Sequence, residues 1–302
     1  MILISAFYLI IIVILILFLI NFLRERKFKN QKYLTKDKTI LITGGSIGIG
    51  REIIHNLITL FHCHVINLDI RESEFESMKE LYKENIINIQ CNIIKIDNII
   101  NFLKDKNVNP DKIDIIINNA GVANNLSLEQ LPENRMVSTK QINLIAPMKI
   151  IKSFIDNKKK KPELFNKQIH FVSLCSVLSH IVSTNGSDYN SSKWGLYGFM
   201  ESVRSEYLYN DKFIFTSICP YAVNTGMFPN FFLSMDTKYV SREIIKSIAL
   251  KENIKFLPEF IYIPIFLYKF APIFISDILQ KYIVNPLTSN IGRRKDNDEL
   301  LK

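Results

Sequence analysis

A tyrosine and a lysine four residues apart are the groups in this sequence with the clearest capacity for chemistry. Tyr189 and Lys193 would lie one turn apart on the same face of a helix. A phenol has an ordinary pKa of about 10, and a nearby ammonium lowers it toward the range of acid–base catalysis. Ser176 stands upstream, at the end of an apolar run. Because Tyr-x-x-x-Lys also occurs on solvated helix surfaces, its meaning depends on the motifs around it.

A glycine-rich turn lies nearer the start of the chain. Residues 39–43 read as an apolar strand, and a helical stretch begins within the glycine-rich segment 44–50 that follows. Glycine permits positive φ and lets the backbone approach a pyrophosphate bound at a helix N-terminus. Such turns also form for structural reasons, yet this one predicts a dinucleotide site. The predicted contacts from this turn are Gly44, Ser46, Gly48, Ile49 and Gly50.

The order of the motifs resembles the short-chain dehydrogenase/reductase family over roughly residues 38–258. Gly-x-x-x-Gly-x-Gly at 44–50 is followed by Asn-Asn-Ala-Gly at 118–121, then by Ser176 and by Tyr189 with Lys193. Four motifs in one order are far more specific than any single one. The resemblance implies an NAD(P)-dependent oxidoreductase that acts on CH–OH groups.

The resemblance also implies a catalytic set of Asn143, Ser176, Tyr189 and Lys193. Tyr189 would be the base in alcohol oxidation and the acid in carbonyl reduction. Lys193 would lower the pKa of Tyr189 and bind the nicotinamide ribose. Ser176 would stabilise the substrate oxygen, and Asn143 would hold a water in a proton relay. The alternatives are a helix kink or cap for Asn143 and a strand-end turn for Ser176.

The predicted cofactor is NAD(H), with NADP(H) as the alternative. Asp69 ends the second strand, where a carboxylate accepts hydrogen bonds from the adenosine ribose and repels a 2′-phosphate. Arg71 is the counter-argument, since a guanidinium binds that phosphate. Asn92 stands where the family usually has an aspartate against adenine, which predicts a weakened contact. The remaining predicted contacts are Asn119, Ala120, Gly121, Tyr189, Lys193, Pro220, Val223 and Thr225.

Alternating apolar runs and helical stretches predict an α/β fold of the Rossmann type, with a doubly wound parallel sheet. Near-continuous apolar runs fit strands that are covered on both faces. The predicted strands are residues 39–43, 64–68, 86–91, 113–118, 168–175, 213–219 and 254–257. The predicted division is an anchor at 1–23, a basic linker at 24–37, a catalytic domain at 38–258 and a C-terminal segment at 259–302.

Residues 1–23 contain no charged side chain, which predicts a retained transmembrane helix. A cleaved signal peptide would have a positive start and a small-residue cleavage site, and neither is present. Basic residues follow between Arg24 and Lys32. By the positive-inside rule, the catalytic domain would lie in the cytosol.

The C-terminal segment is rich in aromatic and aliphatic residues and is interrupted by prolines. Pro258, Pro264 and Pro272 argue against one continuous membrane-spanning helix. The segment would form a substrate lid that also lies on the membrane surface, or it would be ordinary core packing. We expect the polar tail at 289–302 to be mobile.

Composition indicates which classes of partner and ligand to expect. The net charge is +9, but no basic stripe with interleaved aromatic residues or nucleic-acid motif occurs, so nucleic-acid binding is not expected. The four cysteines contain no Cys-x-x-Cys pair, which favours buried, reduced thiols, and no metal is predicted. The family resemblance implies a homodimer formed through the helix that carries Tyr189.

The anchor, the Asn-Thr-Gly-Met-Phe run at 224–228 and the apolar tail are similar to the membrane-bound retinol and 17β-hydroxysteroid dehydrogenase branch. That similarity implies a lipophilic alcohol or ketone as substrate, and the endoplasmic reticulum or a lipid droplet as location. A 3-ketosphinganine reductase using NADPH is the alternative enzyme. A non-catalytic membrane scaffold is the alternative of another class.

Overall fold

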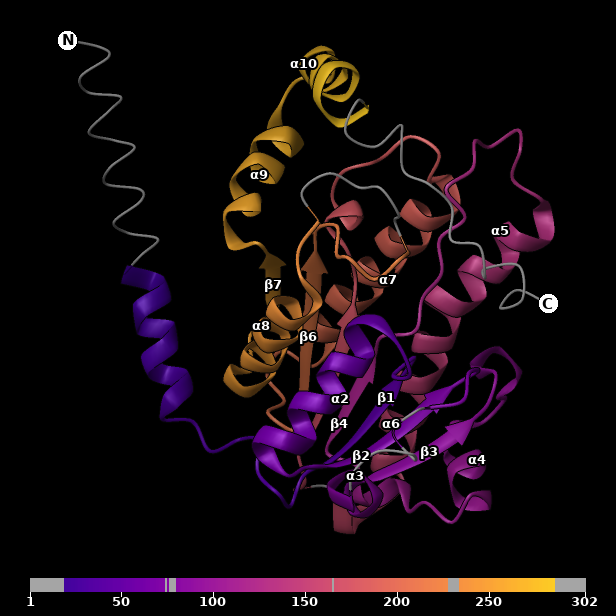
Figure 1. The fold of residues 1–302 in the computed structure, drawn as a ribbon, viewed down its shortest axis with the longest axis vertical. Coiled ribbons are helices and arrows are strands. Elements are labelled where there is room, and N and C mark those ends of the chain that lie inside the picture. Colours follow the sequence, from indigo (N-terminus) through magenta and orange to yellow (C-terminus); the bar gives the residue numbers. More distant parts are fainter. Residues whose placement is uncertain (1–18, 74, 76–79, 165, 228–233, 286–302) are drawn as a thin grey trace.

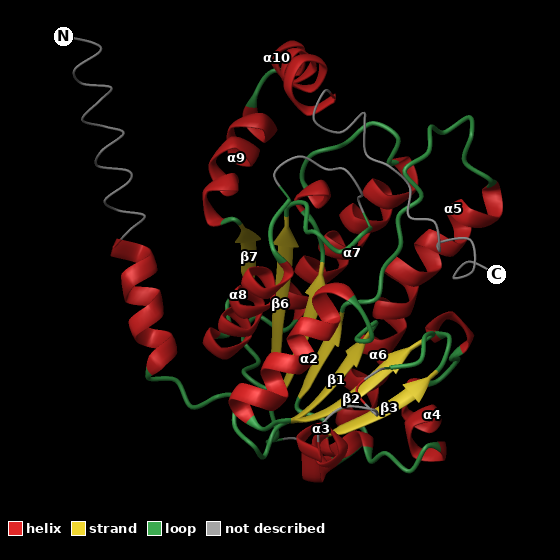
Figure 2. Cartoon of the chain, viewed as in Figure 1, coloured by secondary structure: helices red, strands yellow, loops and turns green. Residues whose placement is uncertain are grey.

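Strands with apolar side chains on both faces build the centre of the molecule. In β1 (Thr39–Thr43), Leu41 points into one buried cluster while Ile40 and Ile42 point into the other. Successive side chains of a strand face opposite sides, so such a strand is buried only between two layers of helices. The computed structural model, which describes residues 19–73, 75, 80–164, 166–227 and 234–285, has this three-layer arrangement (Figure 1; Figure 2).

The described strands form a parallel sheet with the order β3-β2-β1-β4-β5-β6-β7. The chain winds outward in one direction from β1 and in the other from β4, so the topological switch point lies between these two strands. The other strands are β2 (His64–Asp69), β3 (Ile86–Gln90), β4 (Ile115–Asn118), β5 (Ile169–Leu174), β6 (Phe213–Pro220) and β7 (Ile254–Leu257).

Helices cover both faces of the sheet. One face packs against α2 (Gly48–Phe61) and α8 (Thr237–Leu250). The opposite face packs against α4 (Ile99–Asp105), α6 (Ala146–Lys159) and α7 (Ser187–Glu206). The short helix α3 (Glu80–Asn85) precedes β3, and α5 (Glu133–Lys140) runs into α6 through a π-helical turn, η4 (Gln141–Ile145).

The predicted doubly wound sheet is confirmed, with small differences at the strand ends. The strands expected at 39–43 and 254–257 have those bounds, and the one expected at 113–118 begins two residues later, at Ile115. The four cysteines are free; burial raises the pKa of Cys63 to about 12 and that of Cys91 to about 11.

The predicted membrane anchor lies mostly outside the described residues, since only 19–23 of it belong to the described chain. These residues are helical, and the helix continues to residue 29. None of the helices within the described ranges is both long and apolar enough to cross a membrane.

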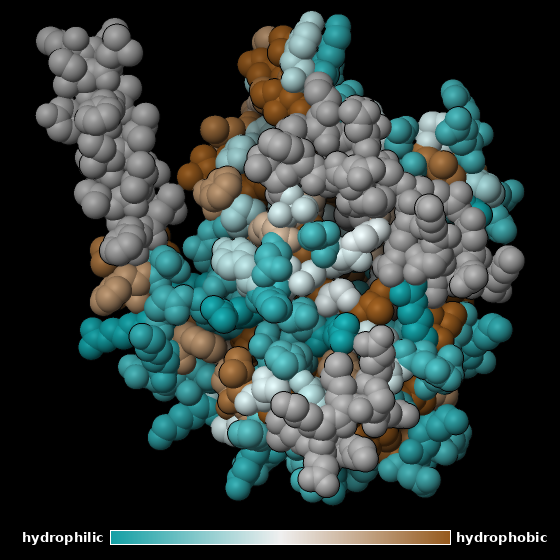
Figure 3. Space-filling model, viewed as in Figure 1, coloured by the Kyte–Doolittle hydropathy of each residue, from teal (hydrophilic) through white to brown (hydrophobic). Residues whose placement is uncertain are grey.

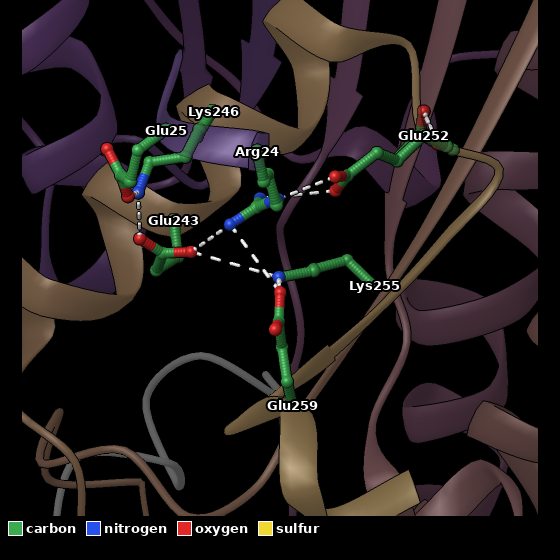
Figure 4. A network of polar contacts seen from close by, with 8 residues as sticks. Arg24, Glu25, Glu243, Lys246, Glu252, Lys255 and Glu259 are labelled. Carbon is green, nitrogen blue, oxygen red and sulfur yellow. Dashed lines mark hydrogen bonds and ion pairs between the residues drawn. The ribbon is translucent and has the colours of Figure 1, made fainter. Parts of the chain in front are cut away.

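A buried ion network attaches this N-terminal helix to the domain, and Figure 4 shows its members. The Arg24 guanidinium lies 2.5 Å from a Glu243 carboxylate oxygen, 2.6 Å from Glu252 and 3.6 Å from Glu259. Lys246 and Lys255 complete the network through their own contacts with Glu243 and Glu259. The network therefore connects the N-terminal helix to α8 and to the segment that follows β7.

The C-terminal segment forms short helices and not one long helix. After β7 come η7 (Glu259–Ile261), α9 (Tyr262–Phe270), α10 (Ile273–Leu279) and a π-helical turn, η8 (Gln280–Val284). Breaks occur at Pro258 and Pro272, as the sequence predicted, whereas Pro264 lies in the first turn of α9 and does not interrupt it, because a proline near a helix start costs no hydrogen bond. Apolar side chains gather on the outer surface of α9 and α10 (Figure 3), where Phe270 and Ile273 are 74% and 79% exposed. The tail predicted to be mobile lies outside the described residues.

Candidate active site

A cavity of about 480 Å³ lies at the carboxyl ends of the central strands. This is the edge, next to the switch point, where open α/β sheets bind their ligands. Its walls come from the glycine-rich turn, the ends of β2 and β4, the start of α7, the loop after β6, and the C-terminal helices. Predicted site residues that line it are Gly44, Gly48, Ile49, Asp69, Asn92, Asn119, Ala120, Gly121, Ser176, Tyr189, Lys193, Pro220, Val223 and Thr225.

The glycine-rich turn has the backbone that its sequence predicts. Gly44 and Gly48 have φ values of +70° and +59°, which favour glycine. A Cβ on Gly50 would lie 2.3 Å from the Gly44 carbonyl oxygen, so Gly50 supports the turn from beneath and does not line the cavity. Ile47, the N-cap of α2, supplies no side-chain cap. The first turn of α2, whose Gly48 and Ile49 line the cavity, is thus not capped by Ile47, which fits a pyrophosphate bound at its N–H groups.

The Asp69 carboxylate is held in place by backbone donors at the end of β2. Its Oδ2 accepts a hydrogen bond from Ser46 N at 2.8 Å, and its Oδ1 accepts one from Arg71 N at 3.0 Å. Ser46 thus acts through Asp69 and does not line the cavity. Lone pairs remain on both oxygens for ribose hydroxyls, because a carboxylate accepts about four hydrogen bonds. Arg71 also lines the cavity.

Two asparagines beside the cofactor half of the cavity form hydrogen bonds with the backbone. Asn92 caps the short helix η2 (Ile93–Lys95) by accepting from Ile94 N at 3.0 Å, so its predicted adenine contact would use the second lone pair. Asn119 donates to the carbonyl oxygens of Thr43 and Gly44 at 3.0 and 2.6 Å. Asn119 therefore holds the turn after β1 against the end of β4.

Tyr189 and Ser176 meet at the centre of the cavity. Their side chains are hydrogen-bonded, and both are buried, at 6% exposure each. Burial raises the pKa of Tyr189, while the bond to Ser176 opposes that rise. Ser176 Oγ also accepts from Leu178 N at 3.1 Å, which caps the single turn η6 (Val177–Ser179).

Lys193 lies beside Tyr189, with its ammonium bound to the backbone. The Lys193 Nζ donates to the Leu174 carbonyl oxygen at 2.6 Å and lies 5.6 Å from the centre of the Tyr189 ring. Burial raises the pKa of Tyr189 in this structure, and the expected lowering of that pKa by the Lys193 ammonium stays a prediction. Burial also lowers the pKa of Lys193 itself, to about 8.

Asn143 lies behind Gly121, within the π-helical turn η4. Its Oδ1 accepts from Val122 N at 2.9 Å, and its Nδ2 donates to Val122 O at 2.9 Å and to Ser192 Oγ at 3.0 Å. The side chain thus makes the structural contacts of the predicted kink, and the predicted water relay stays a prediction. A Cβ on Gly121 would lie 3.4 Å from Asn143 Oδ1 and 3.6 Å from Lys193 Nζ, so both side chains converge on this glycine.

The loop after β6 covers the catalytic end of the cavity. Val223 is buried and forms an isolated bridge with Met235. Thr225 lies close to the glycine-rich turn, since a Cβ on Gly48 would be 3.3 Å from the Thr225 Cβ. With Pro220, these residues reach the cavity as predicted.

The C-terminal helices supply an apolar wall. Ile261 and Ile265 belong to η7 and α9, and Ile283 belongs to η8. The segment predicted to be a substrate lid thus lines the cavity, and its role as a lid stays a prediction. Its individual side chains had no sequence signal beyond the apolar character of the segment. The residues of this wall are Ile261, Pro264, Ile265, Tyr268, Leu279, Ile283 and Val284.

A buried polar cluster behind Tyr189 was missed by sequence reasoning. Asp188 is 1% exposed, and its Oδ2 accepts from Asn124 Nδ2 at 2.7 Å and from Thr139 Oγ1 at 3.0 Å. The cluster fixes the first turn of α7 one residue before Tyr189. An acidic residue in the first turn of a helix is common, so it carries no specific signal.

The parallel sheet, its glycine-rich turn and the cavity at the switch point are typical of enzymes that bind a dinucleotide. Residues 38–235 match the family model described as short chain dehydrogenase. The chain belongs to this family of NAD(P)-dependent oxidoreductases acting on CH–OH groups.

Relatives and solved structures agree with the family. An uncharacterised oxidoreductase of Saccharomyces cerevisiae is 30% identical over 224 residues, which cover 72% of this chain and 70% of the relative. Epidermal retinol dehydrogenase 2 of Mus musculus is 24% identical over 257 residues, or 81% of each chain. A short chain dehydrogenase/reductase from Burkholderia phymatum in complex with NAD has a TM-score of 0.67 at 15% identity, covering 84% of this chain and 98% of that one.

Proposed function

We propose that the protein interconverts a lipophilic alcohol and its ketone or aldehyde with NAD(H). One observation carries this proposal: a single cavity joins the glycine-rich turn, Tyr189 and the apolar wall of the C-terminal helices. An apolar wall next to a few polar groups suits a retinoid, a steroid or a long-chain lipid. Distant similarity to epidermal retinol dehydrogenase 2 supports the same substrate class.

The residues of the cavity have matching roles in this reaction. The cofactor, when bound, accepts or supplies the hydride. In oxidation, Tyr189 accepts the hydroxyl proton of the alcohol, and in reduction it donates that proton to the carbonyl oxygen. Ser176 orients the substrate oxygen with its own hydroxyl, which is hydrogen-bonded to that of Tyr189. Lys193 supplies a buried ammonium 5.6 Å from the centre of the tyrosine ring. When this ammonium is released from the Leu174 carbonyl oxygen, its positive charge favours the phenolate form of Tyr189.

The preference for NAD(H) is supported by Asp69. Its carboxylate is fixed by two backbone N–H groups at the end of β2, where it would accept from ribose hydroxyls and repel a 2′-phosphate. Arg71 in the same wall is what would favour NADPH, and with it the 3-ketosphinganine reductase alternative.

We also propose that the protein is anchored in a membrane, with its catalytic domain in the cytosol. Support comes from the uncharged residues 1–23, the basic residues after them, and the exposed apolar side chains of α9 and α10. The endoplasmic reticulum or a lipid-droplet surface would supply a lipophilic substrate. Fractionation of cells by alkaline carbonate extraction tests the anchor, and release of the intact chain into the soluble fraction would contradict it.

A homodimer remains a further proposal. Exposed apolar side chains on α5 and η4, among them Val137 and Ile145, are compatible with a partner surface beside α7. Light scattering of the protein in detergent, corrected for bound detergent, tests the proposal by its mass.

The main test combines binding and turnover. NADH and NADPH are titrated against the full chain in detergent, followed by turnover with all-trans-retinol, a steroid alcohol and 3-ketosphinganine. Tyr189→Phe should abolish turnover and leave NADH affinity nearly unchanged. Tyr209→Phe is the matched control, because the Tyr209 side chain is almost fully exposed, at 99%.

Each outcome bears on one proposal. NADH binding with oxidation of retinol or the steroid supports the proposed function. NADPH preference with reduction of 3-ketosphinganine supports the alternative enzyme. If neither cofactor binds, the alternative of a non-catalytic membrane scaffold is supported. In that case Tyr189→Phe would not change the localisation of the protein or its effect in cells.

A further inference from the structure

A lysine of the C-terminal lid contacts a buried histidine of the catalytic loop. His180 directly follows η6, the turn that Ser176 caps, and it is 3% exposed. Its Nδ1 lies 2.8 Å from the Nζ of Lys269, which belongs to α9. A lysine ammonium only donates hydrogen bonds, so Nδ1 of the imidazole accepts this one.

The imidazole is held from several sides. Its Nε2 lies 3.5 Å from Cys219 Sγ at the end of β6. Its ring packs edge-on against Tyr197 of α7, with 4.3 Å between centroids, and against Phe256 of β7 at 5.0 Å. Burial and the charge of Lys269 lower the pKa of His180 to about 4. The imidazole is therefore neutral at ordinary pH and able to accept from Lys269.

Lys269 is the single charged residue of α9, whose sequence is YIPIFLYKF. The same helix places Ile265 and Tyr268 in the cavity wall, while Phe266 and Phe270 face outward. Lys269 is exposed overall, but its ammonium contacts the buried His180 imidazole, and a charge-assisted hydrogen bond to that single acceptor ties the apolar helix to one point of the domain.

Two further contacts accompany this attachment. The Lys269 Nζ lies 5.8 Å from the ring centroid of Trp194 on α7. Gln280 of η8 donates from Nε2 to the Val182 carbonyl oxygen at 3.1 Å, two residues after His180. Two parts of the lid, α9 and η8, thus contact the loop of residues 176–182.

We propose that Lys269 and His180 form a latch that positions α9 over the substrate end of the cavity. Neither side chain lines the cavity, so both are positioning residues, and their effect passes through Ile265 and Tyr268. The latch would affect binding of the apolar part of the substrate. It would not affect cofactor binding, because the glycine-rich turn and Asp69 belong to other elements. This inference rests on the proposed function of the cavity.

The latch is tested by variants that remove or retain the acceptor and the donor. Lys269→Met keeps the length of the side chain without its charge, and His180→Leu removes the acceptor. Lys269→Arg and His180→Asn are the conservative variants that retain a donor and an acceptor. Lys281→Met is the matched control, since Lys281 is an exposed lysine of the same segment, over the ring of Tyr282.

With all-trans-retinol as the probe, Lys269→Met should raise KM roughly tenfold, the effect of losing one hydrogen bond to a charged group. The value of kcat and the Kd of NADH should stay within about twofold, since the contacts of Tyr189, Ser176 and the cofactor turn are unchanged. Lys269→Arg should restore most of the KM. The double variant with His180→Leu should be no worse than either single variant, because both remove the same contact.

Two readouts do not depend on turnover. Amide hydrogen exchange of α9 should quicken roughly tenfold in Lys269→Met and in His180→Leu, but not in Lys281→Met. Trp194 is the single tryptophan of the chain. Its quenching by acrylamide should increase in both latch variants, including His180→Leu, which leaves the Lys269 side chain in place.

Unchanged exchange of α9 together with unchanged KM would overturn the latch. A loss of NADH affinity equal to the change in KM would also overturn it, because it would indicate general loosening of the domain. If the wild-type protein turns over none of the three lipophilic substrates, the proposed function fails, and the exchange and quenching measurements still decide on the latch.

Discussion

Replacing Asp69 by alanine should convert the cofactor preference from NADH to NADPH. The carboxylate stands at the end of β2 with 8% of its surface exposed, and it accepts from the backbone N–H groups of Ser46 and Arg71. These bonds fix its two oxygens at the wall of the cavity. Alanine removes the negative charge and leaves both N–H groups without that acceptor, in a wall that Arg71 also lines.

The size of the change in the ratio of the two Kd values follows from two effects that add. NADH loses one or two hydrogen bonds to a charged acceptor, each of about 1.5–3 kcal/mol. NADPH is relieved of a repulsion of about 4 kcal/mol, the value for unit charges about 4 Å apart near a protein surface. Part of this is screened by salt and water, so a net shift of about 3–6 kcal/mol is expected, or about 10²–10⁴ in the ratio of the two Kd values.

Fluorescence titration of NADH and NADPH against the full chain in detergent measures this ratio. Glu72→Ala is the control, because it removes an exposed negative charge nearby and leaves the contacts of Asp69 intact. Adding Arg71→Ala to Asp69→Ala should weaken NADPH again. If Asp69→Ala changes the ratio of the NADH and NADPH Kd values by less than about threefold, the carboxylate does not bind the ribose hydroxyls, and the assignment of NAD(H) to this site is refuted.

Three further predictions concern the turn, the ion network and the buried lysine. Gly50→Ala should weaken NADH binding by about tenfold or more in the same titration, because its Cβ would lie 2.3 Å from the Gly44 carbonyl oxygen; Gly198→Ala, with no atom within 4 Å of the new Cβ, should have no such effect. Arg24→Met should lower the free energy of unfolding by about 1–3 kcal/mol, since the buried Glu243 loses one of its three cations and the half-buried Glu252 loses its guanidinium partner, and unchanged thermal unfolding would count against the network. The pKa of Lys193 is about 8, so its ammonium is lost as pH rises through that value, and NADH binding that needs the charge should be about tenfold weaker at about pH 9 than at about pH 7. Lys193→Met should bind NADH weakly at both pH values, and a pH dependence that persists in this variant would assign the titration to another group.

Sequence alone determined the features that depend on local chemistry. The parallel sheet follows from apolar runs such as those of β1 and β4, which only two covering layers bury. The positive φ of Gly44 and Gly48, the position of Asp69 at a strand end, and the breaks at Pro258 and Pro272 are each fixed by one residue and its neighbours along the chain.

Tertiary structure alone decided how distant groups meet. Nothing in the local sequence relates His180 to Lys269, or Arg24 to Glu243, because these pairs lie 89 and 219 residues apart. The direction in which the pKa of Tyr189 shifts could not be predicted from residue spacing either. A Tyr–Lys pair on one helix face predicts a lowered pKa, whereas burial raises it. The physical reason is that periodicity places a side chain on a face of its own element, whereas desolvation and hydrogen-bond partners come from every element packed against that face.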